Sequence, residues 1–367
     1  MKPAASFLAW ALLSSTSTAV ALEQSPAQEK EQFFDEQGEK PHFTFRWDFL
    51  ARYDSVSHLR VRPDIERGRF ELRPELGFTV SDRFRVGVRA VGDLGTDENT
   101  QNLKNFDNYR SHGVALERYY IEAKPGPVSI LAGSFGMPIV SSEMLWDRDI
   151  QTLGLAATWN IPAGSSRLTF AAAGFYGPQR NHDHTRIGVG QAAWQWGDPG
   201  RFALEAAAAY WHYDVRDLDP GYLRQNYVHA VGGKPQYLSK YRLADLVVRV
   251  RFPILSLPAA VNLDGIHNFG SLTDETNAIE ATISLGSLGA PGQWRFFYTF
   301  QHVERDALPG AYNTDDWWFH TWARGHRFGA AVTIFSNLFV QGSVAFQQRL
   351  DKITWLNRVM IDLTKMF

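Results

Sequence analysis

The chain has 367 residues, a formal net charge of -2 and no cysteine. The absence of cysteine excludes disulfides, thiolate metal sites and a cysteine nucleophile, and the charge lacks the basic excess expected of a nucleic-acid-binding protein. Aromatic residues make up 14% of the chain, yet its mean hydropathy is -0.27. This composition is expected when one face of every strand meets lipid and the other face meets water.

The first residues are typical of a secretory signal peptide. Lys2 supplies a positive start, residues 7–13 form a short apolar run, and residues 19–21 are a small-x-small cleavage site. The run is too short to span a bilayer, for which roughly 20 apolar residues are needed. We therefore expect a signal peptide at residues 1–21, a short polar periplasmic tail at 22–40 and a barrel domain at 41–367.

From residue 41 onward, apolar and polar residues alternate with a period of two, which predicts strands. The first predicted strand, residues 43–54, has one face that is almost wholly aromatic and another that is nearly all charged. Strands at 69–80 and 83–90 flank a two-residue break and form a hairpin. The same alternation predicts strands near 114–124, 128–136, 152–161, 167–177, 186–196, 201–213, 241–252, 260–268, 277–286, 293–305, 324–335, 338–349 and 354–367.

The connections between these strands fall into two alternating classes. Short links occur at 81–82, 125–127, 162–164, 197–200 and 336–337, and long ones at 55–65, 95–113, 214–240 and 306–322. Short periplasmic turns with longer extracellular loops are typical of outer-membrane barrels and place both termini in the periplasm. The predicted fold is all-β, a transmembrane antiparallel up-and-down β-barrel of about 16 strands in the bacterial outer membrane.

A soluble β-sandwich is the alternative for any chain of alternating strands. Aromatic residues near the predicted strand ends favour the barrel, because they would form girdles at the two membrane interfaces. The predicted periplasmic girdle contains Phe202, Phe252, Trp294 and Phe367, and the external girdle contains Tyr53, Tyr176, Trp211 and Trp355.

One strand has an irregular pattern. In residues 186–196, Ile187 and Val189 follow one phase and Trp194 and Trp196 follow the other. A β-bulge would reconcile the two phases, so we predict one there.

The last predicted strand resembles the C-terminal strand that barrel-assembly machinery recognises. Val359, Ile361, Leu363 and Phe367 occupy alternate positions, and Lys365 interrupts them. A lysine near the interface can extend its ammonium group to the lipid headgroups. Lys365 is therefore compatible with an outward, lipid-facing row of side chains on this strand. We expect the assembly machinery to bind through Phe367.

Three stretches resemble the bacterial putative porin family. They are ERYYIEAKPG at 117–126, AGSFGMPIVSSEMLWDRDIQTLGLA at 132–156 and WRFFYTFQHVERDALPGAYNTDDW at 294–317. The last is the most specific, since its strand runs into Val-Glu-Arg-Asp-Ala and a Thr-Asp-Asp loop. The resemblance implies an outer-membrane barrel that lets small solutes diffuse passively, but no pore residue is carried over from the family.

Charged residues on the first three predicted strands would line the lumen. The predicted pore-lining residues are Arg46, Arg52, Arg69, Arg73, Arg83, Arg85 and Arg89, with Glu71 and Glu75 between them. Such a wall could hold a field across the lumen and favour anions. Alternatively, arginines and acids on adjacent strands pair and only keep the wall rigid.

A porin also needs a constriction, and two loops are candidates. One is Gly95–Gly113; the other is Met137–Gln151, which contains Glu143, Asp147, Arg148 and Asp149. The second is favoured, because it follows a glycine-rich strand and has a charged core that a purely external loop would not need. In the alternative, either loop packs on the outer rim.

Other chemistry has little support in the sequence. His182, Asp183 and His184 lie in a predicted external loop, where we expect solvated side chains, and we expect no metal or cofactor. The chain has no Gly-x-Ser-x-Gly, His-Glu-x-x-His or phosphate-binding loop, so we do not expect an enzyme.

The expected function is a porin whose partners are outer-membrane lipid and small hydrophilic solutes or ions, and not nucleic acid. A barrel without an open pore, with a structural or adhesive role, and an outer-membrane enzyme are the alternatives. Whether the protein forms a homo-oligomer is left open by the sequence.

Overall fold

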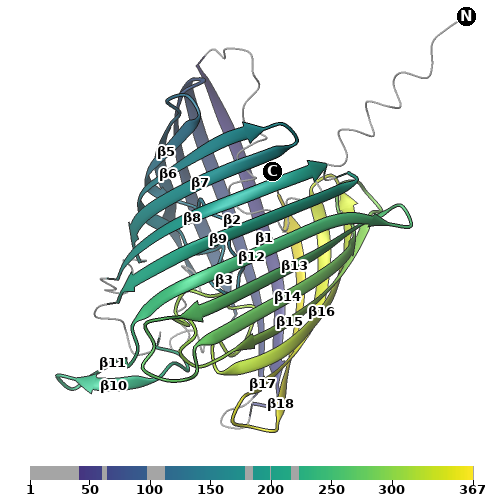
Figure 1. Ribbon diagram of the computed structural model, residues 1–367. Coiled ribbons are helices and arrows are strands. Elements are labelled where there is room, and N and C mark those ends of the chain that lie inside the picture. The colour runs from purple at the N-terminus through teal and green to yellow at the C-terminus, as the bar shows by residue number, and fades with distance from the viewer. Residues whose placement is uncertain are drawn as a thin grey trace, which may run out of the picture.

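The computed structural model describes residues 41–59, 64–96, 112–177, 185–198, 200–215 and 223–366. Within these ranges the chain forms a closed antiparallel barrel of 16 strands and a separate two-stranded hairpin (Figure 1). The barrel strands are β1 (His42–Ser57), β2 (Ile65–Ser81), β3 (Phe84–Gly95), β4 (His112–Ala123), β5 (Val128–Phe135), β6 (Thr152–Ala163), β7 (Ser166–Tyr176), β8 (Arg186–Asp198), β9 (Phe202–Asp214), β12 (Tyr241–Ile254), β13 (Leu257–Asn268), β14 (Asn277–Gly286), β15 (Trp294–Val303), β16 (Ala323–Phe335), β17 (Leu338–Arg349) and β18 (Trp355–Lys365).

Strand pairing follows the chain. Each barrel strand pairs with its neighbour in sequence, β9 pairs with β12, and β1 pairs with β18 to close the barrel. Each of the sixteen predicted strands overlaps one of these barrel strands, so the predicted fold is confirmed. The hairpin of β10 (Val228–Val231) and β11 (Lys234–Tyr237) lies inside a segment that was predicted as loop. No helix among the described residues is long and apolar enough to cross a membrane.

The two ends of the barrel differ. The end where β18 finishes has short turns, such as residues 255–256, where Leu255 and Ser256 both have positive φ angles of 48° and 70°. Such turns match the twist of the strands that they join. The opposite end has the long connections, and the β10–β11 hairpin projects from it (Figure 1). We call these the short-turn end and the long-loop end.

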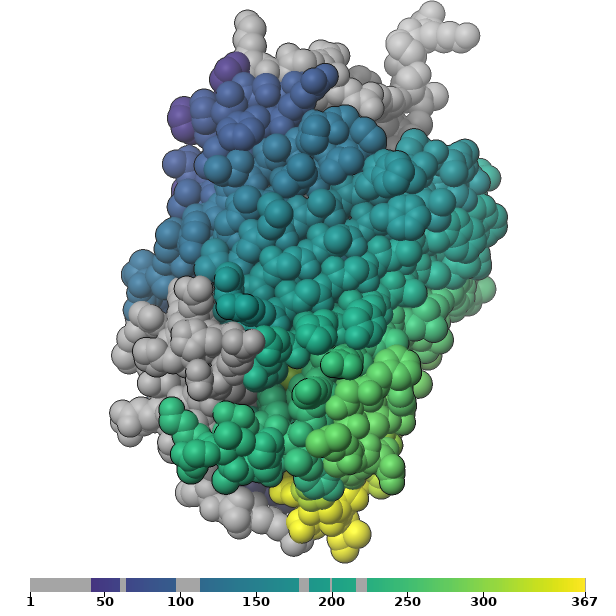
Figure 2. Space-filling model, turned by 60° about the vertical axis from the view of Figure 1, so that its left-hand side comes forward, coloured from purple at the N-terminus to yellow at the C-terminus, as the bar shows by residue number. Residues whose placement is uncertain are grey.

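Alternation along the strands separates two chemically different faces. Phe43 and Phe45 are 69% and 68% exposed on the outside of β1, whereas Asp54 on the inside of the same strand is fully buried. On β3, Val88 is exposed outside and Arg89 is buried inside. Figure 2 shows the strands packed side by side into a continuous wall. The phase predicted for these strands therefore places the apolar side chains outward and the charged ones inward.

The outer face also accommodates the lysine that interrupts the last strand. The ammonium nitrogen of Lys365 lies 4.7 Å from the centre of the Trp47 ring. A cation over an aromatic face is stabilised electrostatically.

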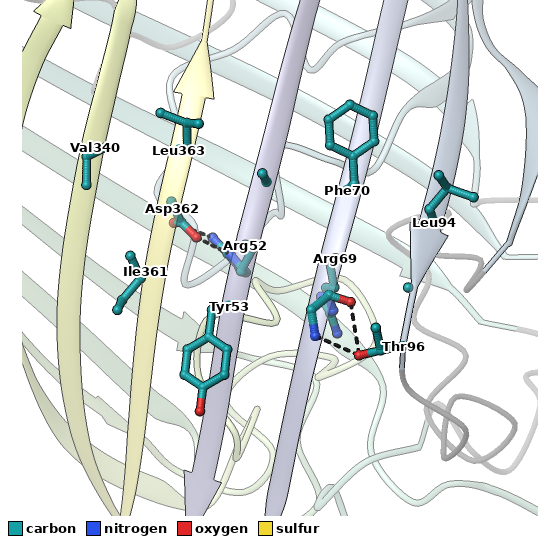
Figure 3. A pocket seen from close by; sticks show the side chains of 13 residues that line it. Arg52, Tyr53, Arg69, Phe70, Leu94, Thr96, Val340, Ile361, Asp362 and Leu363 are labelled. Carbon is teal, nitrogen blue, oxygen red and sulfur yellow. Dashed lines mark hydrogen bonds and ion pairs between the residues drawn. The ribbon is translucent and has the colours of Figure 1, made fainter.

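A shallow apolar groove of about 510 Å³ lies on the outer face of β18, β1, β2 and β3 (Figure 3). Its lining includes outward side chains such as Tyr53, Phe70 and Leu94. Arg52 and Asp362 also line it and form an ion pair with 2.7 Å between Nε and Oδ1.

Two expectations about aromatic residues are wrong. Strand β8 pairs with β7 and β9 without a register shift, so there is no bulge between Ile187 and Trp196. Trp211 does not belong to an external girdle, because its side chain is fully buried inside the barrel and Tyr210 takes the outward position at 50% exposure. Both errors have one cause: the lumen beside β8 and β9 is apolar. Inward Ile187 and outward Trp196 are therefore compatible with a regular strand.

Candidate functional site in the barrel lumen

Two connections from the long-loop end fold into the barrel, and we call residues 136–151 and 304–322 the inner loops. The backbone N–H of Asp147 donates to the carbonyl oxygen of Tyr312 at 2.8 Å. The Asp147 carboxylate accepts the backbone N–H of Asp315 at 3.2 Å. The inner loops therefore brace each other and form one unit.

An apolar core joins the inner loops to the barrel wall. The Trp146 ring stacks on Tyr312 of the other inner loop at 5.6 Å and on Trp211 of β9 at 6.1 Å between centroids. Met144 and Leu145 beside it are fully buried. This part of the lumen is packed like the interior of a soluble domain. Because burying aromatic side chains is strongly stabilising, the packing holds the inner loops against the wall.

A third connection fixes the second inner loop. The side-chain amide of Asn226 donates to the carbonyls of Arg305 and Leu308 at 2.5 and 2.8 Å, and its oxygen accepts the backbone N–H of Gly310 at 2.9 Å. A buried loop needs such partners for its backbone polar groups. The inner loop is consequently held along its length as well as at its tip.

The tip of the second inner loop docks on arginines of the wall. Asp315 Oδ2 lies 3.2 Å from Arg69 Nη1. Asp316 lies between two arginines, with Oδ1 at 2.7 Å from Arg52 Nη1 and Oδ2 at 2.8 Å from Arg327 Nη1. Ion pairs with hydrogen bonds of this kind fix orientation as well as adding energy.

The first inner loop docks on the same side, where Arg73 Nη2 lies 3.0 Å from Asp149 Oδ1. Arg358 of β18 donates to the carbonyl oxygen of Asp315. We call the docking residues the arginine clamp: Arg52, Arg69, Arg73, Arg327 and Arg358. The clamp connects β1, β2, β16 and β18 to both inner loops.

The clamp changes the acidity of the loop carboxyls. Burial alone would raise the pKa of Asp315 and Asp316, but the charges of Arg69 on the first and Arg52 and Arg327 on the second outweigh it. The pKa of each carboxyl is therefore held well below its usual range. Both side chains remain charged at neutral pH, so the docking persists there.

A second buried cluster supports the clamp from behind. The Asp54 carboxylate is fully buried between Arg67, whose Nη2 lies at 2.6 Å, and Arg358, whose Nε lies at 2.8 Å. Removing one partner of such a group leaves an uncompensated buried charge, which is costly. Asp54 thus holds Arg358 in place for its contact with the inner loop.

Most of the predicted wall residues lie on inward positions and are paired. Arg89 Nε lies 2.5 Å from Glu117 Oε2, Arg85 Nη2 lies 3.6 Å from Glu75 Oε1, and Arg73 Nη2 lies 2.5 Å from Glu71 Oε2. Arg46 is directly opposite Glu75 in the strand register.

The prediction that Arg83 lines the lumen is wrong. Arg83 is exposed in the turn between β2 and β3, because β2 ends at Ser81, and it is not part of the lumen wall.

The structure also places the predicted constriction-loop residues. Met137–Gln151 lies inside the barrel, where Arg148 pairs with Glu143. Asp147 is buried, and Asp149 contacts the clamp. Most of the other candidate, Gly95–Gly113, lies outside the described residues, as do His182, Asp183, His184 and Phe367.

Sequence reasoning missed the second inner loop, which was predicted to be external. Residues 306–314 are all buried. The available signal was the apolar content of this segment, where Ala307, Leu308, Ala311 and Tyr312 would have no reason to face water.

Space remains between the inner loops and the wall formed by β12–β17. A cavity of about 180 Å³ lies there. Its lining combines apolar side chains, namely Met137, Trp146, Val247 and Phe297, with the charged side chains Glu143, Arg148, Arg249, Asp264, Glu280, Arg295, Asp316 and Arg327. The Phe297 ring fits against the inner face of β16 because Gly329 has no Cβ, which would lie 2.2 Å from the ring.

Three carboxylates follow consecutive strands beside this cavity, and we call Asp245, Asp264 and Glu280 the acidic row. Asp264 of β13 is directly opposite Glu280 of β14 in the register, and both line the cavity. Asp245 of β12 lies next to Asp264 and accepts a hydrogen bond from Trp211 Nε1 at 3.3 Å. The described residues include no group of three or more His, Cys, Asp and Glu arranged to hold a metal ion.

Comparison with known proteins agrees with this architecture. Residues 53–215 match the model of the putative porin family. The family resemblance is confirmed over that stretch. No curated protein matches the chain in sequence.

Solved porin structures share the fold. OprB of Pseudomonas putida superposes with a TM-score of 0.59 at 13% identity, covering 89% of this chain and 94% of that one. A loop-deletion mutant of OmpT, an outer membrane protein of Vibrio cholerae, gives 0.54 at 10% identity, with coverages of 90% and 100%. OmpF of Salmonella typhi, in complex with daunomycin, gives 0.52 at 10% identity, with coverages of 89% and 97%. At these identities the likeness shows the fold alone.

Proposed function

We propose that the protein is a porin of the bacterial outer membrane, a channel through which small hydrophilic solutes or ions diffuse passively. The observation that carries this proposal is the separation of faces: apolar side chains such as Phe45 point outward, and charged ones such as Arg89 and Asp264 point inward. Lipid outside and water inside account for that arrangement. The family match over 53–215 and the porin fold of the neighbours support it.

The inner loops determine where a solute would pass. They fill the lumen beside β7–β9 and β12 with apolar side chains. The cavity of about 180 Å³ beside β12–β17 is lined by charged groups and provides the polar part of the path. A narrow charged constriction selects solutes by size and charge.

Anion preference remains a prediction, and the geometry argues against the wall as its source. The arginines of β1–β3 that were expected to attract anions contact carboxylates instead, for example Arg52 with Asp362, Arg69 with Asp315 and Arg89 with Glu117. Paired charges leave only a weak net field.

The remaining expectations from the sequence are part of the same proposal. A signal peptide at 1–21 would direct the chain across the inner membrane, a short tail would follow at 22–40, and Phe367 would engage the assembly machinery; these residues lie outside the described ranges. Lipid and small solutes are the proposed partners, and the proposed role is not enzymatic. The protein could act as a monomer or as a homo-oligomer.

A barrel with a closed lumen is the second candidate. It is favoured by one observation, the apolar core that Trp146, Trp211 and Tyr312 build inside the barrel. Under that alternative the protein would have a structural or adhesive role.

Conductance in a planar lipid bilayer separates the two candidates. Purified protein should add current in equal steps at a constant voltage, while heat-unfolded protein in the same detergent should add none. Folded protein that inserts into vesicles and yet gives no steps would contradict the channel and support the closed barrel.

A further inference from the structure

Basic side chains gather on the outer face of three neighbouring strands, β8, β9 and β12, near the long-loop end (Figure 1). Arg186, His212 and Arg242 are exposed, and in each case the next residue of the strand is buried inside the barrel. His212 is directly opposite Arg242 in the register. Lys240, also exposed, lies two residues before Arg242 and so shares its face. We call these four residues the outer basic patch.

The cations of the outer basic patch have no carboxylate partner. The side chains of Arg186, Lys240 and Arg242 form no ion pair and no hydrogen bond among the described residues. On the outward faces of these strands the nearest acid is Asp214, opposite Arg186, and the two side chains form no ion pair. This differs from the arginine clamp, where each arginine contacts an inner loop.

The outer basic patch lies at the edge of the apolar outer surface. From His212 and Arg242 toward the short-turn end, the outward side chains are Tyr210, which is 50% exposed, and then Leu246, which is 55% exposed. Tyrosine is enriched where the lipid tails meet the headgroups. Because the patch lies beyond Tyr210, it stands at the level of the headgroups, where the anionic groups of a lipid are found.

Other parts of the barrel rim have no such patch. On β1–β3, the outward strand residues near the long-loop end are apolar or acidic, namely Tyr53, Glu66, Phe70 and Leu94, and the described strand residues there include no outward lysine or arginine. A general need for charge at the rim would place cations on these strands as well. The cations of β8 and β12 therefore mark one sector of the barrel.

We infer that the outer basic patch binds the phosphate group of a lipid headgroup in the surrounding leaflet. The planar guanidinium of Arg242 can donate to two phosphate oxygens at once, and Lys240 on the same face adds a positive charge. The acyl chains of the same lipid would lie along Tyr210 and Leu246. The inference rests on the proposed function in one respect, the position of the barrel in a membrane.

Native mass spectrometry of the purified protein in detergent, with dioleoyl phosphatidic acid as the probe, tests this site. We expect the wild type to retain the lipid and Lys240→Gln/Arg242→Gln to bind it about tenfold more weakly, because two cations near the phosphate are lost. Arg201→Gln is the matched control. It removes an exposed arginine at the short-turn end, beside the start of β9, and should leave the affinity unchanged.

Two further probes define the ligand. Dioleoyl phosphatidylcholine has the same chains, but its phosphate charge is compensated by choline, so the wild type should bind it about tenfold more weakly than phosphatidic acid and the double variant should lose this preference. Inorganic phosphate at the same concentration should not displace phosphatidic acid, because it has no acyl chains to contact the barrel.

The inference is overturned if the wild type binds the two lipids equally, or if the double variant or Arg201→Gln behaves in the opposite way to that expected. Displacement of the lipid by inorganic phosphate would assign the patch to free phosphate and contradict a lipid site. The substituted side chains are exposed, so the variants should keep the fold of the wild type, which circular dichroism in the same detergent establishes.

Lipid binding and conductance fail independently. Protein that binds phosphatidic acid through the patch but adds no current in bilayers would contradict the channel and support the site. Protein that conducts but does not distinguish the two lipids would contradict the site alone.

Discussion

On the side of the lumen formed by β1, β2, β16 and β18, each arginine of the clamp contacts a carboxylate or a carbonyl of an inner loop. On the side formed by β12–β14, the acids Asp245, Asp264 and Glu280 lie close to one another, and none of them forms an ion pair with an arginine among the described residues. The first region pairs acids with arginines and fixes a loop, whereas the second region groups acids together. A count of charges along the strands therefore does not give the electric field in the lumen, because that field depends on which charges are paired.

The largest loss of stability is expected from a substitution at Asp54, which supports the arginine clamp from behind. Asp54→Asn removes the carboxylate between Arg67 and Arg358 and leaves two buried guanidinium groups uncompensated. We expect the free energy of unfolding to fall by about 3–5 kcal/mol, measured by urea titration in phospholipid vesicles. Asp351→Asn is the control, since its pairs with Arg349 and Lys352 are exposed and are worth only about 0–1 kcal/mol. Equal losses in the two variants would show that Asp54 has no special role.

The next effect concerns the outer face next to the acidic row. Leu246 is 55% exposed on the outside of β12, one residue from inward Asp245. Leu246→Arg would place a charge in lipid and should lower the free energy of unfolding by roughly 2–4 kcal/mol, while Leu246→Phe should be tolerated. If the arginine were neutral, the assignment of faces on β12 would be inverted.

A change in pH should have a smaller effect on the free energy of unfolding. Burial and the charge of Arg224 lower the pKa of His320 on the second inner loop, where its Nδ1 lies 2.7 Å from Asn313 Oδ1. Below about pH 6.5 the unfolded chain binds a proton at this histidine and the folded protein does not. Stability should therefore fall as the pH decreases from that value, by up to about 1.4 kcal/mol for each pH unit.

The measurement compares urea unfolding at pH 7.5 and 5.5 for the wild type and His320→Gln. The variant should lose part of the pH dependence, and an identical dependence would contradict the expectation. The carboxyls of Asp315 and Asp316 do not contribute in this window, because their lowered pKa values keep their stabilisation constant above about pH 4.

The barrel could be predicted because alternation is a local property. Every barrel strand, and the inward position of residues such as Arg52 and Arg89, followed from a period of two. Alternation fails where both faces are apolar. Trp211 was placed outside for this reason, although the inner loops make the lumen apolar beside it.

The candidate site could be predicted only in part. The loop at 137–151 was recognisable by its charges, but its partners were not, because the Arg69–Asp315 contact joins residues 246 positions apart. The alternation could place Asp245, Asp264 and Glu280 in the lumen, but not next to one another: they lie on three different strands, and only the register brings them together. Contacts of this kind depend on barrel closure and loop folding, which no local pattern encodes.

Docking of the second inner loop on the arginine clamp should determine the path that solutes take through the lumen. In Asp315→Asn/Asp316→Asn, the inner loop loses charge-assisted hydrogen bonds worth roughly 1.5–3 kcal/mol each, and Arg52, Arg69 and Arg327 lose their loop partners. Single-channel recording in a salt gradient should show a larger conductance than the wild type and a reversal potential shifted toward anions, with exposed Asp274→Asn as the unchanged control. A conductance and reversal potential equal to those of the wild type would show that docking on the clamp does not determine the path of solutes.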